Sequence, residues 1–511
     1  MKPKQLLSML ACAALAAGTL AGCGGDTQTT EERPTVRIFN RVNAEVQFDK
    51  NNEAVKALED AVNVNLEIEA PPPSSYNDKL QITMASGDLP DIIYLFQTDN
   101  NFDTWAKNGL LLPLDDKIDQ YPNLKDNISD EMWALTKAPS TGQISAVPKS
   151  NTTSHWGYVV NQKWLDALGM EPPTTLDEFY EFAKAVATQD PDGNGAADTF
   201  ALSPSAQNTA GASVWGEYFL MSAFNLQQYA NRSDVDGQYK PKEQFEGYYP
   251  YLTFLRQLYE EKLIDPEFFI NKDGESSEKL LQNRVGMISG HDGAAKGLFG
   301  KASTEQVISD YCYYPPLADN DTGEVVQYIP PAMWGCWGIA ANSKVADAAL
   351  RLLDYGNSEE GWLLTNIGVQ GVHYESYDPA TKELIRTDAQ SEKSRSEMSA
   401  YTPFSVTYHG EPAYISLCDT TEKLQKYNSE LERYLSVTKE VSVPTVNSPK
   451  YIALNANNPD LFKKRDQMEI QYVTGEITLE ELQDFIENEF LPKTAEADQE
   501  TAELLRAATE Q

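Results

Sequence analysis

The chain has 511 residues, of which 41% are hydrophobic and 10% aromatic, so it can form two or three packed units rather than one small core. The formal net charge of −36 and the lack of a basic patch with interleaved aromatic residues exclude a nucleic-acid-binding protein. Five cysteines in so long a chain exclude a disulfide-dense scaffold.

The first 33 residues have the features of an export signal followed by a tether. Basic residues precede an apolar run that is too short to span a bilayer, so residues 1–22 are predicted to be a signal peptide. The Leu-Ala-Gly-Cys sequence ending at Cys23 resembles a bacterial lipoprotein signal, which implies that Cys23 is lipidated and begins the mature protein. The alternative is an ordinary signal peptide with an incidental Cys23. Residues 23–33 are small and polar, as expected of a lipid-anchored flexible tether.

Strands and helices alternate between residues 35 and 96. Apolar residues, alternating with polar ones at 64–68 and continuous at 92–96, predict strands at 35–39, 64–68 and 91–96, and apolar residues at helical spacing predict helices at 52–61 and 76–86. This order predicts an α/β fold with a parallel sheet covered by helices.

Four polar residues follow strands of this predicted sheet. Parallel sheets bind ligands at the carboxyl ends of their strands. Asn40, Arg41, Gln97 and Asp99 are therefore candidate ligand-binding residues by position alone. Arg41 and Arg284 are also candidate partners for the carboxylate of an anionic sugar, although an ordinary surface salt bridge is the alternative for each.

A second region begins near residue 149. Its predicted strands and helices are 157–161, 163–168, a helix opened by a capping box at Thr175, helices around 215–224 and 248–262, and a strand at 284–288. Further elements are a strand at 339–341, a helix at 344–356, a helix opened by a second capping box at Thr478, and a marginal alanine-rich helix in residues 493–511.

Three motifs, taken in order, resemble one family. They are Ala-Ser-Gly-Asp-Leu-Pro-Asp at 85–91, the segment 158–200 with its Asp-Pro-Asp-Gly-Asn-Gly loop, and Gly-Ile-Ala-Ala-Asn-Ser at 338–343 with its continuation to residue 374. Together they are similar to the extracellular solute-binding proteins of carbohydrate ABC importers, and to the long oligosaccharide- and alginate-binding lipoproteins among them.

The resemblance implies a two-lobed type II periplasmic-binding fold with additional C-terminal helices. We expect residues 34–148 with 290–340 to form one lobe, and 149–289 with 341–511 to form the other. The chain is expected to cross between the lobes near 146–151, 286–290 and 338–343. Lobe closure on a solute would then precede docking on permease subunits in the membrane, and we expect a monomer outside the cytoplasmic membrane.

The loop from Asp190 to Asp198 has the spacing of a calcium-binding loop. In this register Asp190, Asp192, Asn194 and Asp198 supply side-chain oxygens, and Ala196 supplies its carbonyl. The usual glutamate at the twelfth position is replaced by Ala201, which lowers the expected affinity. The loop is therefore either a structural Ca²⁺ site or a polar turn that needs no metal. No catalytic cofactor is expected.

Aromatic and polar residues gather near the predicted strand ends and crossings. Sugars stack their apolar faces on aromatic rings and hydrogen-bond through their hydroxyl groups. The candidate sugar-binding residues are His155, Trp156, Trp215, His291, Asp292, Trp334 and Trp337. The alternative for any one tryptophan is packing in a core.

The sequence thus favours a lipid-anchored carbohydrate-binding protein, with an oligosaccharide as ligand, over an enzyme. Sequence motifs for a serine nucleophile elbow, a His-Glu-x-x-His metal site or a phosphate-binding loop are lacking. A peptide or other solute and a secreted glycoside hydrolase remain alternatives. Cys312 and Cys336 are expected to be either a disulfide or two buried thiols.

Overall fold

The computed structural model describes residues 33–41, 49, 51–71, 73–96, 101–150, 155–204, 207–208, 211–212, 214–215, 217–226, 239–271, 275–291, 304–329, 333–380, 383–398, 421–446 and 448–509. The chain divides into two units, residues 1–33 and 34–511, and the features below belong to the second. The expected signal peptide, Cys23 and most of the tether lie outside the described residues.

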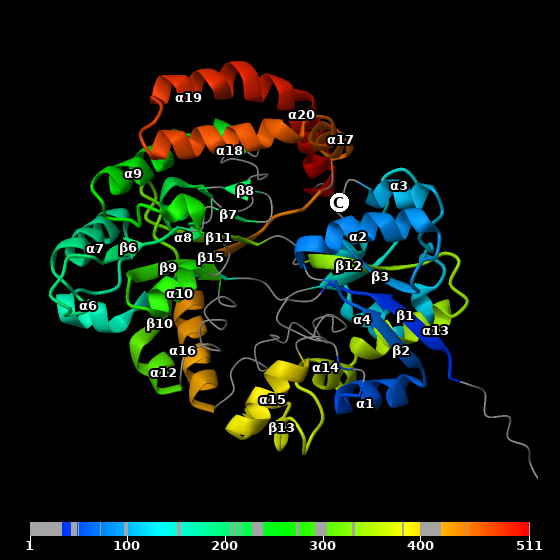
Figure 1. Ribbon diagram of the computed structural model, residues 1–511. Coiled ribbons are helices and arrows are strands. Elements are labelled where there is room, and N and C mark those ends of the chain that lie inside the picture. Colours follow the sequence, from blue (N-terminus) through cyan, green and yellow to red (C-terminus); the bar gives the residue numbers. More distant parts are fainter. Residues whose placement is uncertain are drawn as a thin grey trace, which may run out of the picture. The chain divides into compact units, whose positions relative to one another are not determined.

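The first sheet has five strands in the order β2-β1-β3-β12-β4 (Figure 1). As predicted, β1 is parallel to both β2 and β3, whereas β12 is antiparallel to its neighbours β3 and β4. The strands are β1 (Thr35–Phe39), β2 (Asn65–Glu69), β3 (Ile92–Leu95), β4 (Val147–Ser150) and β12 (Met333–Ile339).

Helices complete the core around this sheet. The apolar faces of α1, α2 and α13 enter the same buried cluster as the strands, and Asn52 caps α1 by accepting hydrogen bonds from the backbone of Ala54 and Val55. The helices of this part are α1 (Glu53–Val62), α2 (Pro73–Ser86), α3 (Phe102–Lys107), α4 (Pro122–Asn127), α5 (Asp130–Leu135), α13 (Ala346–Gly356) and α14 (Glu359–Asn366).

The second sheet has four strands in the order β10-β5-β9-β6. Here β5 is antiparallel to β9 and β10, and β6 is parallel to β9. The strands are β5 (Trp156–Asn161), β6 (Phe200–Leu202), β9 (Val285–His291) and β10 (Tyr311–Tyr314).

Helices from the middle and the end of the chain build the second core. Thr175 and Thr478 form the two predicted capping boxes, and Gly169 ends α6 in the left-handed conformation. Around this sheet are α6 (Gln162–Leu168), α7 (Leu176–Thr188), α8 (Tyr218–Met221), α9 (Tyr248–Glu260), α10 (Glu275–Leu281) and α12 (Thr304–Asp310). The helix expected around 215–224 is shorter, because α8 begins at Tyr218 and continues as the 3-10 turn η2 (Ser222–Phe224).

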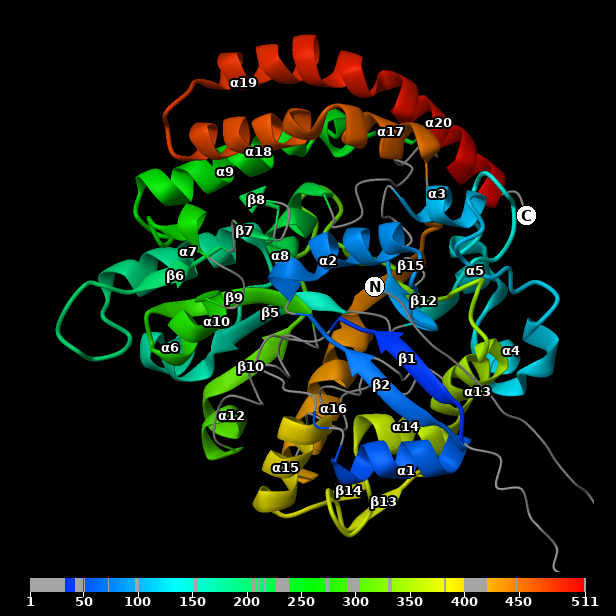
Figure 2. The same cartoon turned by 45° about the vertical axis from the view of Figure 1, so that its right-hand side comes forward.

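The C-terminal helices pack on the second core. In both views α19, η7 and α20 follow one another end to end and lie beside α18 and α17 (Figures 1 and 2). Tyr472, Phe485 and Phe490 are buried with residues of α9. The end of the chain is therefore more than the marginal helix expected. The elements are α16 (Thr421–Val437), α17 (Pro449–Asn457), α18 (Pro459–Val473), α19 (Leu479–Phe485), the π-helical turn η7 (Ile486–Phe490) and α20 (Leu491–Thr509).

Smaller elements connect these parts. The strands β11 (Val325–Ile329) and β15 (Thr438–Ser442) form a parallel pair. The remaining elements are the hairpin of β13 (Ser376–Asp378) and β14 (Glu383–Ile385), the pair β7 (Gln207–Asn208) and β8 (Gly211–Ala212), the helix α15 (Asp388–Met398), and the short turns η1 (Ile118–Gln120), η3 (Lys242–Gln244) and η4 (Phe268–Ile270).

Two elements lie elsewhere than the expected lobe boundaries placed them. The strand β10, expected with the first lobe, pairs with β5 in the second sheet, and α13, expected with the second lobe, packs into the first core. Residues 286–290 belong to β9 of the second sheet, and the chain passes from β4 of the first sheet to β5 of the second; the expected lobe crossings stay predictions. The assignment of every other segment to a lobe stays a prediction.

The described cysteines are free thiols. Cys336 is buried in β12 of the first sheet and Cys312 lies in β10 of the second, so the two do not pair. Of the two alternatives, the structure has two free thiols, of which Cys336 is buried and Cys312 is partly buried.

Candidate functional site

The first candidate region is one edge of the first sheet. Asn40 and Arg41 directly follow β1, and Phe96 directly follows β3, its parallel neighbour. The strand β4 is parallel to β3, because both are antiparallel to β12, so Lys149 near the end of β4 lies at the same edge. Sequence reasoning found Asn40 and Arg41 from their position but missed Lys149 and Phe96.

Asn40 at this edge is unusual for a buried polar residue. Its side chain is fully buried, and within the described part of the chain neither its amide nitrogen nor its amide oxygen has a hydrogen-bond partner. A buried amide without partners is destabilising by about 1–3 kcal/mol, so a hydrogen bond from a ligand hydroxyl to this group would be stabilising.

Two cations lie over two aromatic rings at the same edge. The guanidinium carbon of Arg41 is 5.6 Å from the ring centre of Phe96, and Nζ of Lys149 is 5.7 Å from that of Tyr94. The rings of Tyr94 and Phe96 meet edge to face with centres 5.3 Å apart. Burial, and then the charge of Arg41, lower the pKa of Lys149 to about 8.

The second candidate region is the edge of the second sheet where β5 begins and β9 ends. Trp156 pairs in register with His291, and the half-buried ring of Trp156 stands edge-on to Tyr218 with centres 4.0 Å apart. This pairing brings together two residues that the sequence analysis selected separately. Their common contact with a ligand stays a prediction.

The C-terminal part of the chain contributes to this edge. His155 Nε2 is 3.1 Å from Oε1 of Glu440 in β15, and its ring meets that of Tyr434 in α16 at 5.3 Å. The hydroxyl of Tyr434 donates to the backbone carbonyl of Trp156 at 3.0 Å. Sequence reasoning missed Tyr434 and Glu440, because about 280 residues separate them from the residues that they contact.

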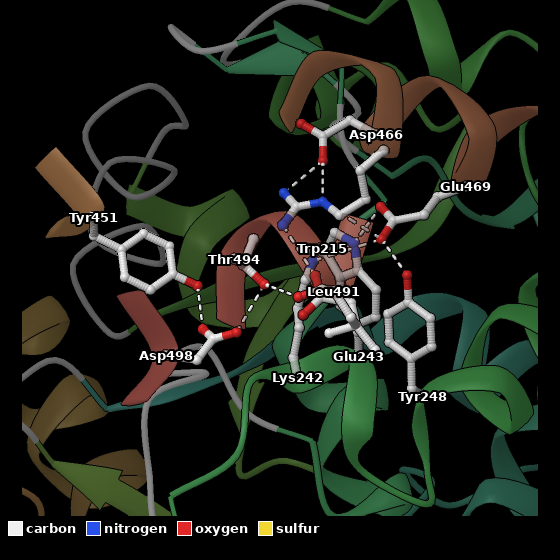
Figure 3. Close-up of polar contacts among 11 residues, drawn as sticks. Trp215, Lys242, Glu243, Tyr248, Tyr451, Asp466, Glu469, Leu491, Thr494 and Asp498 are labelled. Atoms are coloured by element: carbon white, nitrogen blue, oxygen red, sulfur yellow. Dashed lines mark hydrogen bonds and ion pairs between the residues drawn. The ribbon is translucent and has the colours of Figure 1, made fainter. Parts of the chain in front are cut away.

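Trp215, expected to stack on a sugar, lies in a cluster of charged residues (Figure 3). Its Nε1 donates to Glu469 at 2.6 Å, its ring stacks on Tyr248 with centres 5.3 Å apart, and Nζ of Lys242 is 3.5 Å from its ring centre. These contacts join α18 to the second core. The surroundings of Trp215 thus support a structural role, although its part in ligand binding stays a prediction.

The same cluster contains a second buried cation. Arg465 of α18 donates to Glu243 at 3.0 Å and to Asp466 at 2.7 Å, and lies 3.8 Å from Glu469. Burial acts to lower the pKa of Arg465, but the three carboxylates outweigh it and the net shift is upward. Burial, and then Arg465, lower the pKa of Lys242 to about 8.

The remaining candidates have different outcomes. Trp337 is fully buried in the first core against Tyr94, which supports a packing role, and its contact with a ligand stays a prediction. Arg284 precedes β9 and is exposed at the end of that strand opposite His291. Trp334 and His291 belong to strands β12 and β9. Gln97, Asp99 and Asp292 lie outside the described residues.

The predicted calcium loop is exposed and held by its own hydrogen bonds. Asp190 accepts from the backbone nitrogen of Gly195 at 2.8 Å, and the side-chain nitrogen of Asn194 donates to Asp192 at 2.8 Å and to Asp198 at 3.1 Å. Burial and the neighbouring Asp190 raise the pKa of Asp192. Among the described residues, no three acidic, histidine or cysteine side chains are grouped to hold a metal. The carboxylates of Asp192 and Asp198 therefore accept hydrogen bonds from the side-chain nitrogen of Asn194. They fit a cation only if the Asn194 amide is rotated so that its oxygen, and not its nitrogen, faces them.

Comparison with known proteins gives the family. The family model described as bacterial extracellular solute-binding protein matches residues 49–361. The chain therefore belongs to the bacterial extracellular solute-binding protein family.

Two relatives from Bacillus subtilis (strain 168) are similar over most of the chain. The lipoprotein LipO is 27% identical over 73% of this chain and 75% of its own length. The polygalacturonan/rhamnogalacturonan-binding protein YtcQ is 24% identical over 90% of both chains.

Solved structures have the same fold. The substrate-binding protein FusA of S. pneumoniae in complex with kestose aligns with a TM-score of 0.68 at 20% identity, over 93% of this chain and 99% of that one. The alginate-binding protein AlgQ2, solved without calcium, aligns with a TM-score of 0.67 at 18% identity, over 94% and 99%. An EF-hand mutant of FusA is also similar, with a TM-score of 0.67 at 19% identity over 93% and 99%. The expected two-lobed α/β fold is confirmed by these likenesses.

Proposed function

We propose that this protein is the substrate-binding component of an ABC importer, which captures an oligosaccharide between two lobes and delivers it unchanged to a membrane permease. Membership of the extracellular solute-binding family supports the transport role. The observation that favours a sugar is the edge of the first sheet, where the unpartnered amide of Asn40 lies beside Arg41, Lys149 and the ring of Phe96. Amides and cations suit sugar hydroxyl and acid groups, and an aromatic ring suits the apolar face of a sugar.

Ligand capture follows from differential affinity. A ligand that contacts both lobes binds the closed form more tightly than the open form, so binding shifts the population toward the closed form. The permease is a separate polypeptide in this proposal. Within the described ranges, no helix has both the length and the apolar character needed to cross a bilayer.

A thermal-shift screen of the mature protein tests the proposed function. The panel contains neutral oligosaccharides, acidic oligosaccharides and peptides of similar size. An oligosaccharide at 100 times its dissociation constant should add about 2.7 kcal/mol to the free energy of unfolding. Stabilisation by peptides alone, or steady release of shortened glycans, would contradict the proposal.

The lipid anchor is the second part of the proposal. Acylation at Cys23 would hold the binding protein at the outer face of the cytoplasmic membrane, where ligand passes to the permease. In cells labelled with a radioactive fatty acid, the wild-type protein should carry label in the membrane fraction. Cys23→Ala should lose the label and the membrane association, and retention of both would refute this part.

Calcium binding at 190–198 is the third part. Asp190, Asp192 and Asp198 would supply carboxylate oxygens, Asn194 its amide oxygen and Ala196 its carbonyl, in a structural role remote from ligand. Calcium should raise the melting temperature of the wild type, and Asp192→Asn should abolish this increase. Equal melting temperatures in calcium and in chelator would leave the alternative of a metal-free polar turn.

A further inference from the structure

The two cations at the edge of the first sheet are brought together by the strand order. Arg41 follows β1, and Lys149 lies near the end of β4, on the far side of β3 and β12. Their supporting rings, Phe96 and Tyr94, touch edge to face at 5.3 Å. The charge of Arg41 acts on both Lys149 and Tyr94: it adds to the lowering of the pKa of Lys149 by burial, and it partly opposes the rise in the pKa of Tyr94 that burial and Cys336 cause.

No acidic partner balances these charges in the part of the chain that the structure describes. Other cations of the same region are paired there, as Arg37 is with Asp88 at 2.9 Å and Lys125 with Asp119 at 2.6 Å. No described carboxylate lies within 4 Å of the charged nitrogens of Arg41 or Lys149. Two like charges that are partly withdrawn from water repel each other, and an anion between them would remove this repulsion.

The neighbouring side-chain amide of Asn40 sets a second, independent requirement on the ligand, which is that it form hydrogen bonds as well as neutralise charge. Both polar atoms of the Asn40 side chain are buried without a partner, one residue before Arg41. A simple inorganic anion could neutralise the cations, but a ligand with both an acid group and hydroxyl groups can also satisfy a donor and an acceptor of the amide. The aromatic ring of Phe96 at the same edge adds an apolar surface.

We propose that Asn40, Arg41 and Lys149 form a subsite for a uronic acid, so that the ligand is an acidic oligosaccharide whose carboxylate lies between the two cations. This inference rests on the proposed function and specifies its substrate class. The Arg41 guanidinium can take a carboxylate through two parallel hydrogen bonds, while Lys149 contributes a point charge. Asn40 pairs with a hydroxyl of the same sugar residue.

Isothermal titration of the mature protein with three matched probes tests the subsite. The probes are trigalacturonate, its fully methyl-esterified form and a neutral trisaccharide, with inorganic phosphate as the test for a free anion. Trigalacturonate should bind at least about tenfold more tightly than its ester, since a charge-assisted hydrogen bond is lost on esterification. The difference in affinity between trigalacturonate and its methyl ester should become smaller as salt is added, because salt screens the charges.

Variants assign the effect to the two cations. Arg41→Gln and Lys149→Met should each weaken trigalacturonate binding about tenfold or more and change the affinity for the ester less than about twofold. Arg41→Lys, which keeps the charge, should retain part of the affinity. Arg37→Gln is the matched control, because it removes an arginine in the middle of β1 that is already paired with Asp88 and should leave both affinities unchanged.

The outcomes separate this inference from the proposed function. Equal affinity for acid, ester and neutral sugar, or variants that weaken all three alike, would overturn the uronate subsite and leave the oligosaccharide proposal standing. Phosphate binding as tight as trigalacturonate binding would also overturn the subsite. If no oligosaccharide of either kind binds, both proposals fail.

Discussion

Replacement of Arg465 by methionine should destabilise the attachment of α18 to the second core. In this cluster two cations, Arg465 and Lys242, face the three carboxylates of Glu243, Asp466 and Glu469. The net charge of the cluster is therefore one negative charge. The carboxylates are hardly accessible to water, with side-chain exposures of 3% for Glu243, 16% for Asp466 and 0% for Glu469. Arg465→Met leaves three buried acids facing one lysine, so the sum becomes two negative charges.

The expected loss is about 3–5 kcal/mol in the free energy of unfolding at pH 7.5, the range for breaking a buried ion pair by removing one partner. The adjacent Lys464 gives a matched control, because its pair with Glu489 at 2.8 Å is about half exposed on both sides. Lys464→Met should lose no more than about 1 kcal/mol.

The loss should also depend on pH in a definite direction. Burial raises the pKa of Asp466 while Arg465 lowers it, so removal of Arg465 raises it further. The folded variant then binds more protons than its unfolded chain as the pH falls through that raised pKa, which favours the folded state. The deficit of Arg465→Met relative to wild type should therefore shrink between pH 7.5 and pH 5.

Urea unfolding followed by tryptophan fluorescence at pH 7.5 and pH 5 measures both the loss of unfolding free energy and its change with pH, since Trp215 lies in the cluster. The reasoning is refuted if Arg465→Met and Lys464→Met agree within about 1 kcal/mol at pH 7.5, or if the deficit of Arg465→Met grows on acidification.

Three further predictions concern stability. Because the pKa of Lys242 is lowered to about 8, the unfolded chain binds more protons above that pH, and the wild-type free energy of unfolding should rise relative to Lys242→Met between pH 8 and about 10 in urea titrations. Gly335→Ala should lower the melting temperature, because φ is +106° and the new Cβ would lie 2.4 Å from the Tyr94 hydroxyl; unchanged melting would contradict this close approach. Thr478→Ala removes the capping box of α19 and should lose about 1 kcal/mol in chemical denaturation, whereas Thr478→Ser should restore most of it.

Local signals predicted the elements that depend on nearby residues. The strands and helices between residues 35 and 96, the two capping boxes and the glycine that ends α6 agree with the structure, because each depends on side-chain periodicity or on a cap within a few residues. Asn40 and Arg41 could be selected from the same pattern, since a strand end is visible in the sequence.

The charged residues that lie near the candidate site residues in the folded chain could not be selected in this way. Lys149 lies more than 100 residues after Arg41, and Glu469 of α18, which accepts a hydrogen bond from Trp215, lies about 250 residues after that tryptophan. Nothing in the local sequence distinguishes Lys149 from the paired lysines of the same region. The misplacement of β10 and α13 has the same origin, because strand partners and core membership are set by contacts between distant segments.

The sequence by itself predicted an export signal, and it determined the alternation of strands and helices and the positions where strands end, because these depend on short-range periodicity, capping and composition. Tertiary structure alone decided which strands pair, which tryptophans are buried, and that two cations and an unpartnered amide share one sheet edge. The physical reason is that burial and charge balance depend on the whole set of neighbouring groups, and in this chain many of those neighbours come from distant segments, as Arg41 and Lys149 do at a separation of more than 100 residues.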